Sequence, residues 1–205
     1  MSKDVIIIGA GGHAKVVADI VLCSGDNLIG FLDDDDDKQG SEVFKTYKVV
    51  GKIADSEKYG DYYFVVAVGD NYMRAEIVKG LAGMKFYTAV HPSAVIADTV
   101  RIGKGTVVMA GAVVNVDTVI GKHCIINTAV TVDHDNKIGN FVHISPGAHL
   151  AGGVSVDDSS WLCTGAVVIN NVHISKDVVL GASATALKDI DAPGVYVGTP
   201  VRRAK

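Results

Sequence analysis

The sequence is poor in the residues that mark several large classes of protein. Only 4 of its 205 residues are proline and 6% are aromatic, whereas 23 are glycine. Because 48% of the residues are hydrophobic, the chain is neither disordered nor collagen-like. An aliphatic chain that is poor in aromatics and interrupted by glycine favours stacked β-structure over a helical bundle.

The sequence also lacks a basic region, a disulfide framework and a long hydrophobic run. The net charge is −4 without an extended run of lysine and arginine, which argues against a nucleic-acid partner. The three cysteines, Cys23, Cys124 and Cys163, have no CxxC spacing, so we expect reduced thiols, and neither disulfides nor a zinc site. The apolar run 5–8 is too short for a signal sequence or a membrane span. We therefore expect a cytoplasmic protein with no membrane partner.

The C-terminal part of the chain repeats with a period of six residues. Every sixth residue from 90 to 180 is Val, Ile or Leu, at sixteen positions without an insertion. This period fits neither an α-helix nor a strand meander, and it is typical of a triangular prism whose coils contain three short strands each. We expect each aliphatic residue to fill a corner of the prism, and the small residue that often lies two positions earlier to let the chain turn. The aliphatic positions are Val90, Ile96, Ile102, Val108, Val114, Ile120, Ile126, Val132, Ile138, Ile144, Leu150, Val156, Leu162, Val168, Ile174 and Leu180.

The N-terminal part has the pattern of a βαβ unit and predicts a small parallel sheet. We expect strands over 4–8, 28–32 and 62–68, a helix over 13–23, and a second helix that ends near 81.

The turn after the first strand matches G-x-G-x-x-A from Gly9 to Ala14, and an acid follows at Asp33. Glycines and a helix N-terminus suit a diphosphate, so NAD is the obvious ligand for this turn. The segment is too short for the second half of a dinucleotide-binding fold, and a mononucleotide-sized ligand fits it better.

Three motifs now carry a resemblance that extends over nearly the whole chain. They are Gly11-Gly12-His13 after a strand, Phe31-Leu32-Asp33-Asp34, and the ending Gly194-Val195-Tyr196-Val197-Gly198-Thr199-Pro200 after the hexapeptide repeats. The chain resembles the bacterial hexapeptide-repeat sugar O- and N-acyltransferases, a family that includes the UDP-4-amino-sugar N-acetyltransferase of bacillosamine biosynthesis and sialic acid O-acetyltransferases.

The resemblance implies an α/β, Rossmann-like N-terminal subdomain over 1–88 that holds a nucleotide sugar. It implies a left-handed parallel β-helix over 89–205, assembled as a homotrimer with acetyl-CoA as cosubstrate. By the same resemblance, the residues that meet the nucleotide sugar are Gly11, Gly12, His13, Asp33, Asp34 and Gly69. The neighbouring acids Asp35 to Asp37 are expected to form a solvated loop.

The most polar of the repeats contains Asp133-His134-Asp135-Asn136. Acetyl transfer from a thioester needs a base that removes a proton from the attacking amine or hydroxyl, and an imidazole with a pKa near 6.5 suits this task. A carboxylate on the other ring nitrogen fixes the tautomer and raises the basicity. The resemblance places this carboxylate at Asp135, where the family usually has Glu, and Asp133 is the alternative. We expect His134 to act as the base in a direct transfer, because no Ser or Cys sits beside it.

Gly152 follows His134 by three hexads, which is one full coil further on. Its N–H is our candidate for binding the oxyanion that develops on the thioester. The resemblance adds coenzyme contacts at His143, Thr164 and Ala182, the last through its backbone. The basic residues Lys188, Arg202, Arg203 and Lys205 either meet the coenzyme phosphates or form a solvated tail. We expect no metal; a zinc site that uses His143 and His149 in a trimer is the alternative.

The leading hypothesis is an acetyl-CoA-dependent N-acetyltransferase that acts on a nucleotide-activated amino sugar. One alternative is a sugar O-acetyltransferase that acts on sialic acid or an exopolysaccharide sugar. Another is a non-catalytic scaffold that binds sugar nucleotides, and an NAD oxidoreductase is the weakest. The sequence does not name the sugar, the nucleotide base or the position that is acetylated.

Overall fold

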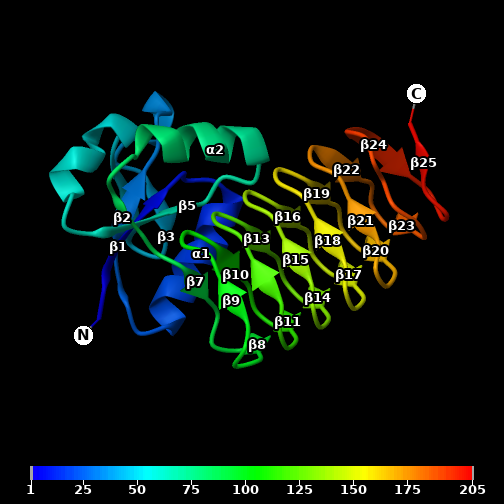
Figure 1. Cartoon of the computed structure of the whole chain (residues 1–205). Coiled ribbons are helices and arrows are strands. Elements are labelled where there is room, and N and C mark those ends of the chain that lie inside the picture. Colours follow the sequence, from blue (N-terminus) through cyan, green and yellow to red (C-terminus); the bar gives the residue numbers. More distant parts are fainter. Residues whose placement is uncertain (1, 205) are drawn as a thin grey trace.

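The computed structural model describes residues 2–204. An N-terminal α/β domain lies at one end of a long stack of short strands, and the C-terminus lies at the other end (Figure 1). The stack is a parallel β-helix, left-handed as expected, built from three sheets that each take one strand from every coil. No helix in residues 2–204 is both long and apolar enough to span a bilayer.

The N-terminal domain is a six-stranded sheet in the order β3-β4-β2-β1-β5-β6, with a helix on each face. Its strands are β1 (Asp4–Ile8), β2 (Asn27–Leu32), β3 (Glu42–Phe44), β4 (Tyr47–Gly51), β5 (Tyr63–Val66) and β6 (Lys85–Phe86). Its helices are α1 (Gly12–Cys23), α2 (Asn71–Gly80) and the short 3-10 helices η1 (Asp36–Lys38) and η2 (Ile53–Tyr59). The predicted parallel sheet is confirmed for five strands. β3 pairs antiparallel with β4 in a hairpin that we did not predict.

The alternation of side chains along β1 explains why both faces of the sheet are covered. Val5 and Ile7 point to the side of α1, and Ile6 and Ile8 point to the side of α2. The α1 side also contains Ile125 and other outward residues of the β-helix, so the core of the N-terminal domain continues onto the β-helix. This shared apolar contact buries α1 between the sheet and the β-helix.

Each coil of the β-helix contributes one strand to each of three faces. The first face contains β7 (Ala89–Val90), β10 (Val107–Val108), β13 (Ile125–Ile126), β16 (His143–Ile144), β19 (Trp161–Leu162), β22 (Val178–Leu180), β24 (Gly194–Val197) and the antiparallel β25 (Arg202–Arg203). The second face contains β8 (Val95–Ile96), β11 (Val113–Val114), β14 (Thr131–Val132), β17 (His149–Leu150), β20 (Val167–Val168) and β23 (Thr185–Ala186). The third face contains β9 (Arg101–Ile102), β12 (Val119–Ile120), β15 (Lys137–Ile138), β18 (Ser155–Val156) and β21 (His173–Ile174).

The predicted coil of three hexads is confirmed, since Val107 pairs with Ile125 and Ile125 pairs with His143. The predicted place of the aliphatic residues is wrong. From Val108 to Ile174 each is the second residue of a two-residue strand, where its side chain points into a buried interior, and none of them forms a corner. The corners are made three residues earlier, where every sixth residue from 105 to 183 has φ between 54° and 75°. Nine of these fourteen left-handed positions are not glycine, which hides the turn from a search for Gly.

We name the corners by the faces they join. The first corner joins the first and second faces, the second corner joins the second and third, and the third corner joins the third and first. Three glycines stack on one another where the chain enters the third corner. A Cβ at Gly103 would lie 2.5 Å from Gly121, and one at Gly121 would lie 2.5 Å from Gly139. These positions therefore need glycine because successive coils approach closely there.

Candidate active site

His134 lies at the second corner, in the loop between β14 and β15. Its Nδ1 lies 2.7 Å from Oδ2 of Asp135, which has φ 60° and so turns its carboxylate back toward the ring. Because a carboxylate only accepts, Nδ1 carries the proton and Nε2 keeps its lone pair. Asp133 does not touch the ring; its Oδ1 accepts from the His134 N–H at 2.9 Å and from Asn115 Nδ2 at 3.0 Å. The geometry therefore favours Asp135 over Asp133 as the orienting carboxylate.

The His134 ring is exposed over 52% of its side-chain surface and can be reached from outside the chain. The hydrogen bond to Asp135 raises the pKa of His134 above its usual 6.5, and the charges of Asp133 and Asp135 add to this effect. An exposed imidazole with a carboxylate on Nδ1 and a free Nε2 is suited to general base catalysis.

Gly152 lies directly beside His134, as its place one coil further on predicts. A Cβ at this position would lie 2.5 Å from Cε1 and 2.6 Å from Nε2 of the ring, so the imidazole packs against the glycine. Gly153 donates its N–H to the His134 carbonyl at 2.9 Å, which ties the two coils together. Within residues 2–204, the Gly152 N–H has no acceptor. A free N–H beside the reactive nitrogen fits the oxyanion role that we expect for it.

Asn136 explains why this repeat tolerates a polar residue inside the prism. It is fully buried, and its Nδ2 donates to the carbonyls of Asp133 at 2.8 Å, His134 at 3.2 Å and Ala151 at 3.0 Å. The Thr118 hydroxyl one coil away donates to the same Asp133 carbonyl at 2.8 Å. Asn136 therefore shapes the loop that presents His134 and does not itself take part in the chemistry.

The glycine turn of the N-terminal domain leaves open space beside two of its residues. Gly9 has φ +99°, and a Cβ there would lie 3.1 Å from the Ala67 carbonyl oxygen, so the fold itself requires glycine there. A Cβ at Gly11, Gly12 or Gly69 would meet nothing within 4 Å, and none of these three residues has a positive φ. The protein's own packing gives no reason for glycine at these three positions. Close approach of a ligand to the backbone is a reason.

Asp33 and Asp34 support the turn through hydrogen bonds within the protein. Asp33 Oδ2 accepts from the Ala10 N–H at 2.7 Å and lies 3.3 Å from Lys38 Nζ, and Asp34 Oδ1 accepts from the Ile53 N–H at 2.9 Å. Burial alone would raise the pKa of Asp33, but backbone hydrogen bonds and Lys38 lower it overall. Hydrogen bonds thus hold both carboxylates at the end of β2. The expected solvated loop is confirmed, because residues 35–37 are exposed.

His143 lies on the first face, away from the second corner that carries His134. Its ring stacks on Trp161 with centroids 5.6 Å apart and an interplanar angle of 5°. Asn127 Nδ2 donates to His143 Nε2 at 3.3 Å, and Asn127 Oδ1 accepts from the Thr128 N–H at 2.8 Å, which fixes the orientation of the amide. Because Nε2 accepts this hydrogen bond, the proton of the neutral His143 ring sits on Nδ1, which is buried without a hydrogen-bond partner in residues 2–204. We did not predict Asn127.

His13 and His143 meet at the junction between the N-terminal domain and the β-helix. Burial, with a smaller effect from the Arg74 guanidinium, lowers the pKa of both rings to about 4. The Gly69 backbone lies beside His143 and acts in the opposite direction. Nε2 of His13 is also buried without a partner in the described chain. Buried polar atoms without partners are rare, so these two ring nitrogens are candidates for contact with a ligand.

Two residues that we did not single out from the sequence hold this junction together. Arg74 on α2 donates to the carbonyls of His123 and Phe141 in the third corner, and Asn71 donates to the Ser159 carbonyl one coil further on. These partners lie 49 to 88 residues away along the chain. The signal in the sequence that could have identified them is their separation of three residues, which places the Asn71 and Arg74 side chains on one face of a helix.

Thr164 and Ala182 lie one above the other at the first corner, where the Ser183 N–H donates to the Thr164 carbonyl at 2.9 Å. The second face separates this corner from the one that carries His134 and Gly152. Within one chain the structure therefore brings His134 to Gly152 but does not bring Thr164, Ala182 or His143 to them. The reason is the length of the coil. Only residues separated by a whole number of coils, as Val107 and Ile125 are, return to the same place on the prism.

The basic residues Lys188, Arg202 and Arg203 near the C-terminal end of the described chain are all exposed. Arg203 is tied to the chain end by an Nη2 hydrogen bond to the Pro193 carbonyl at 2.8 Å. Arg202 is exposed, and Lys205 lies outside the described residues. The expectation that this end meets coenzyme phosphates stays a prediction.

One group of three metal-ligating side chains occurs in the part of the chain that the structure describes. Asp19, Cys23 and His91 bring one ligand atom each to within 4.8 Å of one another, at the C-terminal end of α1. His143 and His149, the alternative zinc ligands, lie on different faces of the β-helix. Neither is at a corner, since His143 begins β16 and His149 begins β17. All three cysteines are free thiols, as expected.

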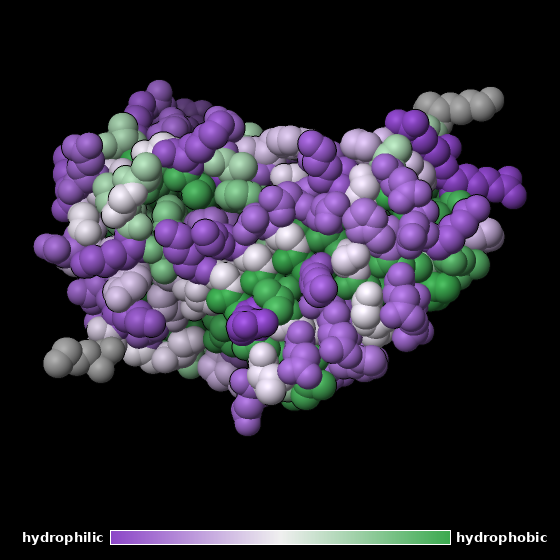
Figure 2. All heavy atoms as spheres, viewed as in Figure 1, coloured by the Kyte–Doolittle hydropathy of each residue, from purple (hydrophilic) through white to green (hydrophobic). Residues whose placement is uncertain are grey.

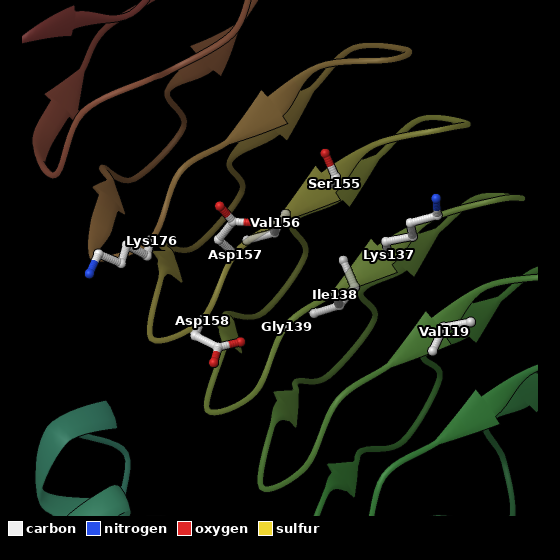
Figure 3. Close-up of a pocket in the computed structure, with 9 residues that line it drawn as sticks. All are labelled: Val119, Lys137, Ile138, Gly139, Ser155, Val156, Asp157, Asp158 and Lys176. Carbon is white, nitrogen blue, oxygen red and sulfur yellow. The ribbon is translucent and has the colours of Figure 1, made fainter.

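Two cavities on the β-helix lie on either side of the second corner. A cavity of about 620 Å³ lies along the third face, where Lys137 and Ser155 project from neighbouring strands, with Asp158 and Lys176 at the loops (Figure 3). A smaller cavity of about 340 Å³ lies on the second face and includes Asp133. None of the predicted site residues lines the larger cavity.

Comparison with known proteins agrees with both parts of the chain. The family model of the PglD N-terminal domain matches residues 4–81. The chain is similar to PerB from Caulobacter crescentus in complex with CoA and GDP-perosamine, with 36% identity, 98% of this chain and 97% of that chain covered, and a TM-score of 0.91. It is similar to the acetyltransferase domain of PglB from Neisseria gonorrhoeae in complex with acetyl coenzyme A, with 35% identity, 100% of both chains covered and a TM-score of 0.91. UDP-N-acetylbacillosamine N-acetyltransferase from Bacillus subtilis is 36% identical over 112 residues, 53% of this chain and 52% of that protein, so the match spans about half of that relative.

Proposed function

The chain belongs to the hexapeptide-repeat sugar N-acyltransferase family, and from this premise we propose that it transfers an acetyl group from acetyl-CoA to the amino group of a nucleotide-linked amino sugar. The observation that carries the proposal is the His134–Asp135 pair, whose free Nε2 lies against Gly152. The open glycine turn at Gly11 and Gly12 supports the nucleotide half. Among the similar structures, one holds CoA and GDP-perosamine and another holds acetyl coenzyme A.

The chemistry follows from the orientation of the His134 ring. The sugar amine attacks the carbonyl carbon of the thioester, and Nε2 of His134 accepts the proton that the amine loses. The new C–N bond forms, the C–S bond breaks, and the proton passes from His134 to the departing coenzyme thiolate. Asp135 stabilises the imidazolium during this step, and the Gly152 N–H stabilises the oxyanion. Variants of the Caulobacter enzyme in which one histidine is replaced have been crystallised with both CoA and GDP-perosamine, so both ligands bind that enzyme without this histidine.

We propose that two chains build each site and that the enzyme is a homotrimer. The coenzyme positions Thr164 and Ala182 lie at one edge of the second face, and His134 lies at the other edge. A ring of three chains that meet through this face brings the first corner of one chain to the second corner of its neighbour. The exposed apolar side chains on and beside the face support this assembly, among them Val95 at 63% exposure and Val116 at 49%. In Figure 2 apolar side chains (green) reach the surface along the β-helix between polar ones.

The activity is tested by incubating the protein with acetyl-CoA and a panel of UDP- and GDP-linked amino sugars, followed by mass spectrometry. We expect one added acetyl group on an amino sugar and none on the matched sugar that carries a hydroxyl at the same position. Acetylation of the hydroxyl sugars alone would convert the assignment to an O-acetyltransferase. Absence of acetylation in every arm, with both ligands bound, contradicts an enzymatic role and favours a sugar-nucleotide-binding scaffold.

The shared site is tested by sedimentation and by mixing variants. We expect the mass of three chains of 21.4 kDa each. His134→Ala and Ala182→Trp break opposite corners, so random exchange of the two inactive proteins should restore about a quarter of the sites. His134→Ala mixed with Gly152→Trp is the matched control, because both changes fall on one corner and leave no intact pair. Equal behaviour of the two mixtures after confirmed exchange would show that each site is built within one chain.

A further inference from the structure

Arg74 is a buried cation, and within residues 2–204 none of its hydrogen bonds is to a carboxylate. Only 1% of the residue is exposed, although it lies on α2 at the edge of the N-terminal domain. A buried guanidinium is costly unless its donors are satisfied, and a carboxylate is the usual partner. Here the acceptors are carbonyl oxygens and one amide oxygen. The six bonds go from Nε to His123 O, from Nη1 to Val68 O, Gly69 O and Asp70 O, and from Nη2 to Asn71 Oδ1 and Phe141 O.

One edge of the guanidinium binds two successive coils of the β-helix. Nε donates to the His123 carbonyl at 2.8 Å and Nη2 donates to the Phe141 carbonyl at 2.9 Å. His123 and Phe141 are equivalent residues of the third corner, both with positive φ, in neighbouring coils. Because coils repeat at the spacing of β-strands, about 4.8 Å, two stacked carbonyls suit the fixed fork of an arginine.

The rest of α2's N-terminal turn continues along the same corner. Asn71 Nδ2 donates to Ser159 O at 2.9 Å, the next equivalent carbonyl, and Asn71 Oδ1 accepts from Arg74 Nη2 at 2.7 Å. Tyr72 lies near Asp177, one coil further still, and Asp177 raises the pKa of the Tyr72 hydroxyl. Three successive coils are thus hydrogen-bonded to one helical turn, so α2 has one register on the β-helix.

The other edge of the guanidinium holds the loop that faces the first face. Nη1 donates to Val68 O at 2.9 Å and to Gly69 O at 3.1 Å. Gly69 lies beside the His143 ring, and the strand that carries His143 begins two residues after Phe141. Arg74 therefore links the loop beside the open glycine turn to the coil that carries His143. If only the apolar packing of α1 joined the N-terminal domain to the β-helix, the domain could slide along the coils. The hydrogen bonds from Arg74 to two stacked carbonyls prevent this sliding.

We propose that Arg74, with Asn71, is a positioning residue that holds the nucleotide-sugar loop at a fixed register on the β-helix. This inference rests on the proposed function, because the register then sets where the amino group meets the thioester. Because Arg74 is buried and its donors are bonded to protein oxygens, it is not placed to contact either substrate. Its loss leaves the binding of each substrate intact but misaligns the two, and a displacement of about 1 Å can lower the rate about 10²-fold.

The test compares Arg74→Lys with Lys79→Met in the full-length protein. Lysine keeps the charge but cannot bind two stacked carbonyls with one planar edge. Lys79 is the matched control because it lies on the exposed side of the same helix and pairs only with Glu76. For Arg74→Lys we expect kcat to fall about 10²-fold, with KM and calorimetric Kd for both substrates within about threefold of the wild type. For Lys79→Met we expect wild-type values.

Asn71→Ala is the second variant, because it retains the bonds of Arg74 to the His123 and Phe141 carbonyls and removes the bond of Asn71 to the next coil together with its bond to Arg74 Nη2. It should lower kcat about tenfold with KM unchanged. A lower melting temperature with an unchanged kcat per folded protein, in either variant, would overturn the proposal and leave a structural role. Hydrogen exchange at the Gly69 and Asp70 amides should rise in Arg74→Lys and not in Lys79→Met, whether or not the wild type turns over a given sugar. If the wild type is inactive but exchange rises in Arg74→Lys, only the proposed function is refuted. If exchange at these amides does not rise in Arg74→Lys, the positioning role is refuted.

Discussion

Two regions of this protein use histidine in opposite ways. At the second corner, His134 is exposed and hydrogen-bonded to Asp135, and its pKa is raised above 6.5. At the domain junction, His143 packs against the N-terminal domain near Arg74, and burial lowers its pKa to about 4. Both residues belong to the hexapeptide-repeat region and lie in neighbouring hexads. The difference shows that in a β-helix the covering structure, and not the repeat, decides the charge of a side chain.

The two regions therefore respond to pH in different ranges. His134 loses its proton, and becomes a base, only as the pH rises through its raised pKa. His143 and His13 are neutral in the folded protein above about pH 4 and gain protons near 6.5 in the unfolded chain. Folding stability from these two rings is thus present above 6.5 and is lost as the pH falls toward 4.

The largest effect that separates the two regions is expected from His134→Ala. Removal of a general base should lower kcat about 10²–10⁴-fold while the fold stays intact, because the ring is exposed. His173→Ala is the matched control, since His173 Nε2 lies 3.0 Å from Asp157 Oδ2 and forms a second exposed histidine–carboxylate pair on the β-helix. We expect that variant to stay within about twofold of the wild type in a coupled thiol-release assay. Near wild-type turnover by His134→Ala would remove His134 from the mechanism.

Gly11→Val is expected to act on the other region only. A Cβ at Gly11 meets nothing within 4 Å, so the folded protein has room for the side chain, but the valine occupies the space that we assign to the diphosphate. Calorimetry should show loss of measurable nucleotide-sugar binding with acetyl-CoA affinity unchanged. Equal loss of both ligands, or tight binding of NAD by the wild type, would refute a separate nucleotide-sugar site.

Gly152→Ala is expected to have a smaller effect on the second corner. The added Cβ lies 2.5 Å from the His134 ring, which must move away from its position beside the Gly152 N–H. We expect kcat to fall about tenfold to 10²-fold with KM for the nucleotide sugar unchanged. Gly60→Ala is the control, because its Cβ would have only an ordinary contact at 3.5 Å. An unchanged kcat in Gly152→Ala would show that the ring position is not critical.

Asp135→Asn is expected to give the smallest change, a shift of the pH profile. Loss of the carboxylate removes the main cause of the raised pKa of His134, so the acidic limb of kcat/KM should move to lower pH. The maximum rate should fall as well, because the imidazolium loses its partner. Histidine NMR titration of both proteins measures the shift directly. If the acidic limb of the pH profile does not move, a group other than His134 is responsible for it.

Much of the fold was predictable because it depends on local pattern. The run 4–8 is strand β1 as predicted, and the helix expected over 13–23 is α1, which begins one residue earlier at Gly12. The hairpin of β3 and β4 was missed, because its strands are short and follow an acidic run without clear alternation. The corner positions were also missed, since nine of them carry ordinary residues in a left-handed conformation that no residue type marks.

The candidate site was predictable where one spacing along the chain determines a contact. A separation of one full coil places Gly152 beside His134, and that neighbour was found. Asn127 was missed because an asparagine near a turn has many roles, and only its contact with His143 distinguishes it. Arg74 and Asn71 were missed because their acceptors are main-chain carbonyls, which any sequence supplies.

The sequence by itself determined the period of six, the triangular coil, the βαβ order of the first domain and the polar repeat at His134. These follow from the alternation of buried and exposed side chains, which is a local property of the chain. Only the tertiary structure decided that Asp135 orients the ring and Asp133 does not, that His143 is kept neutral, and that Arg74 joins the two domains. Each of these depends on a left-handed turn or on contacts between residues far apart in the sequence, and such distances are set only when the whole chain has packed.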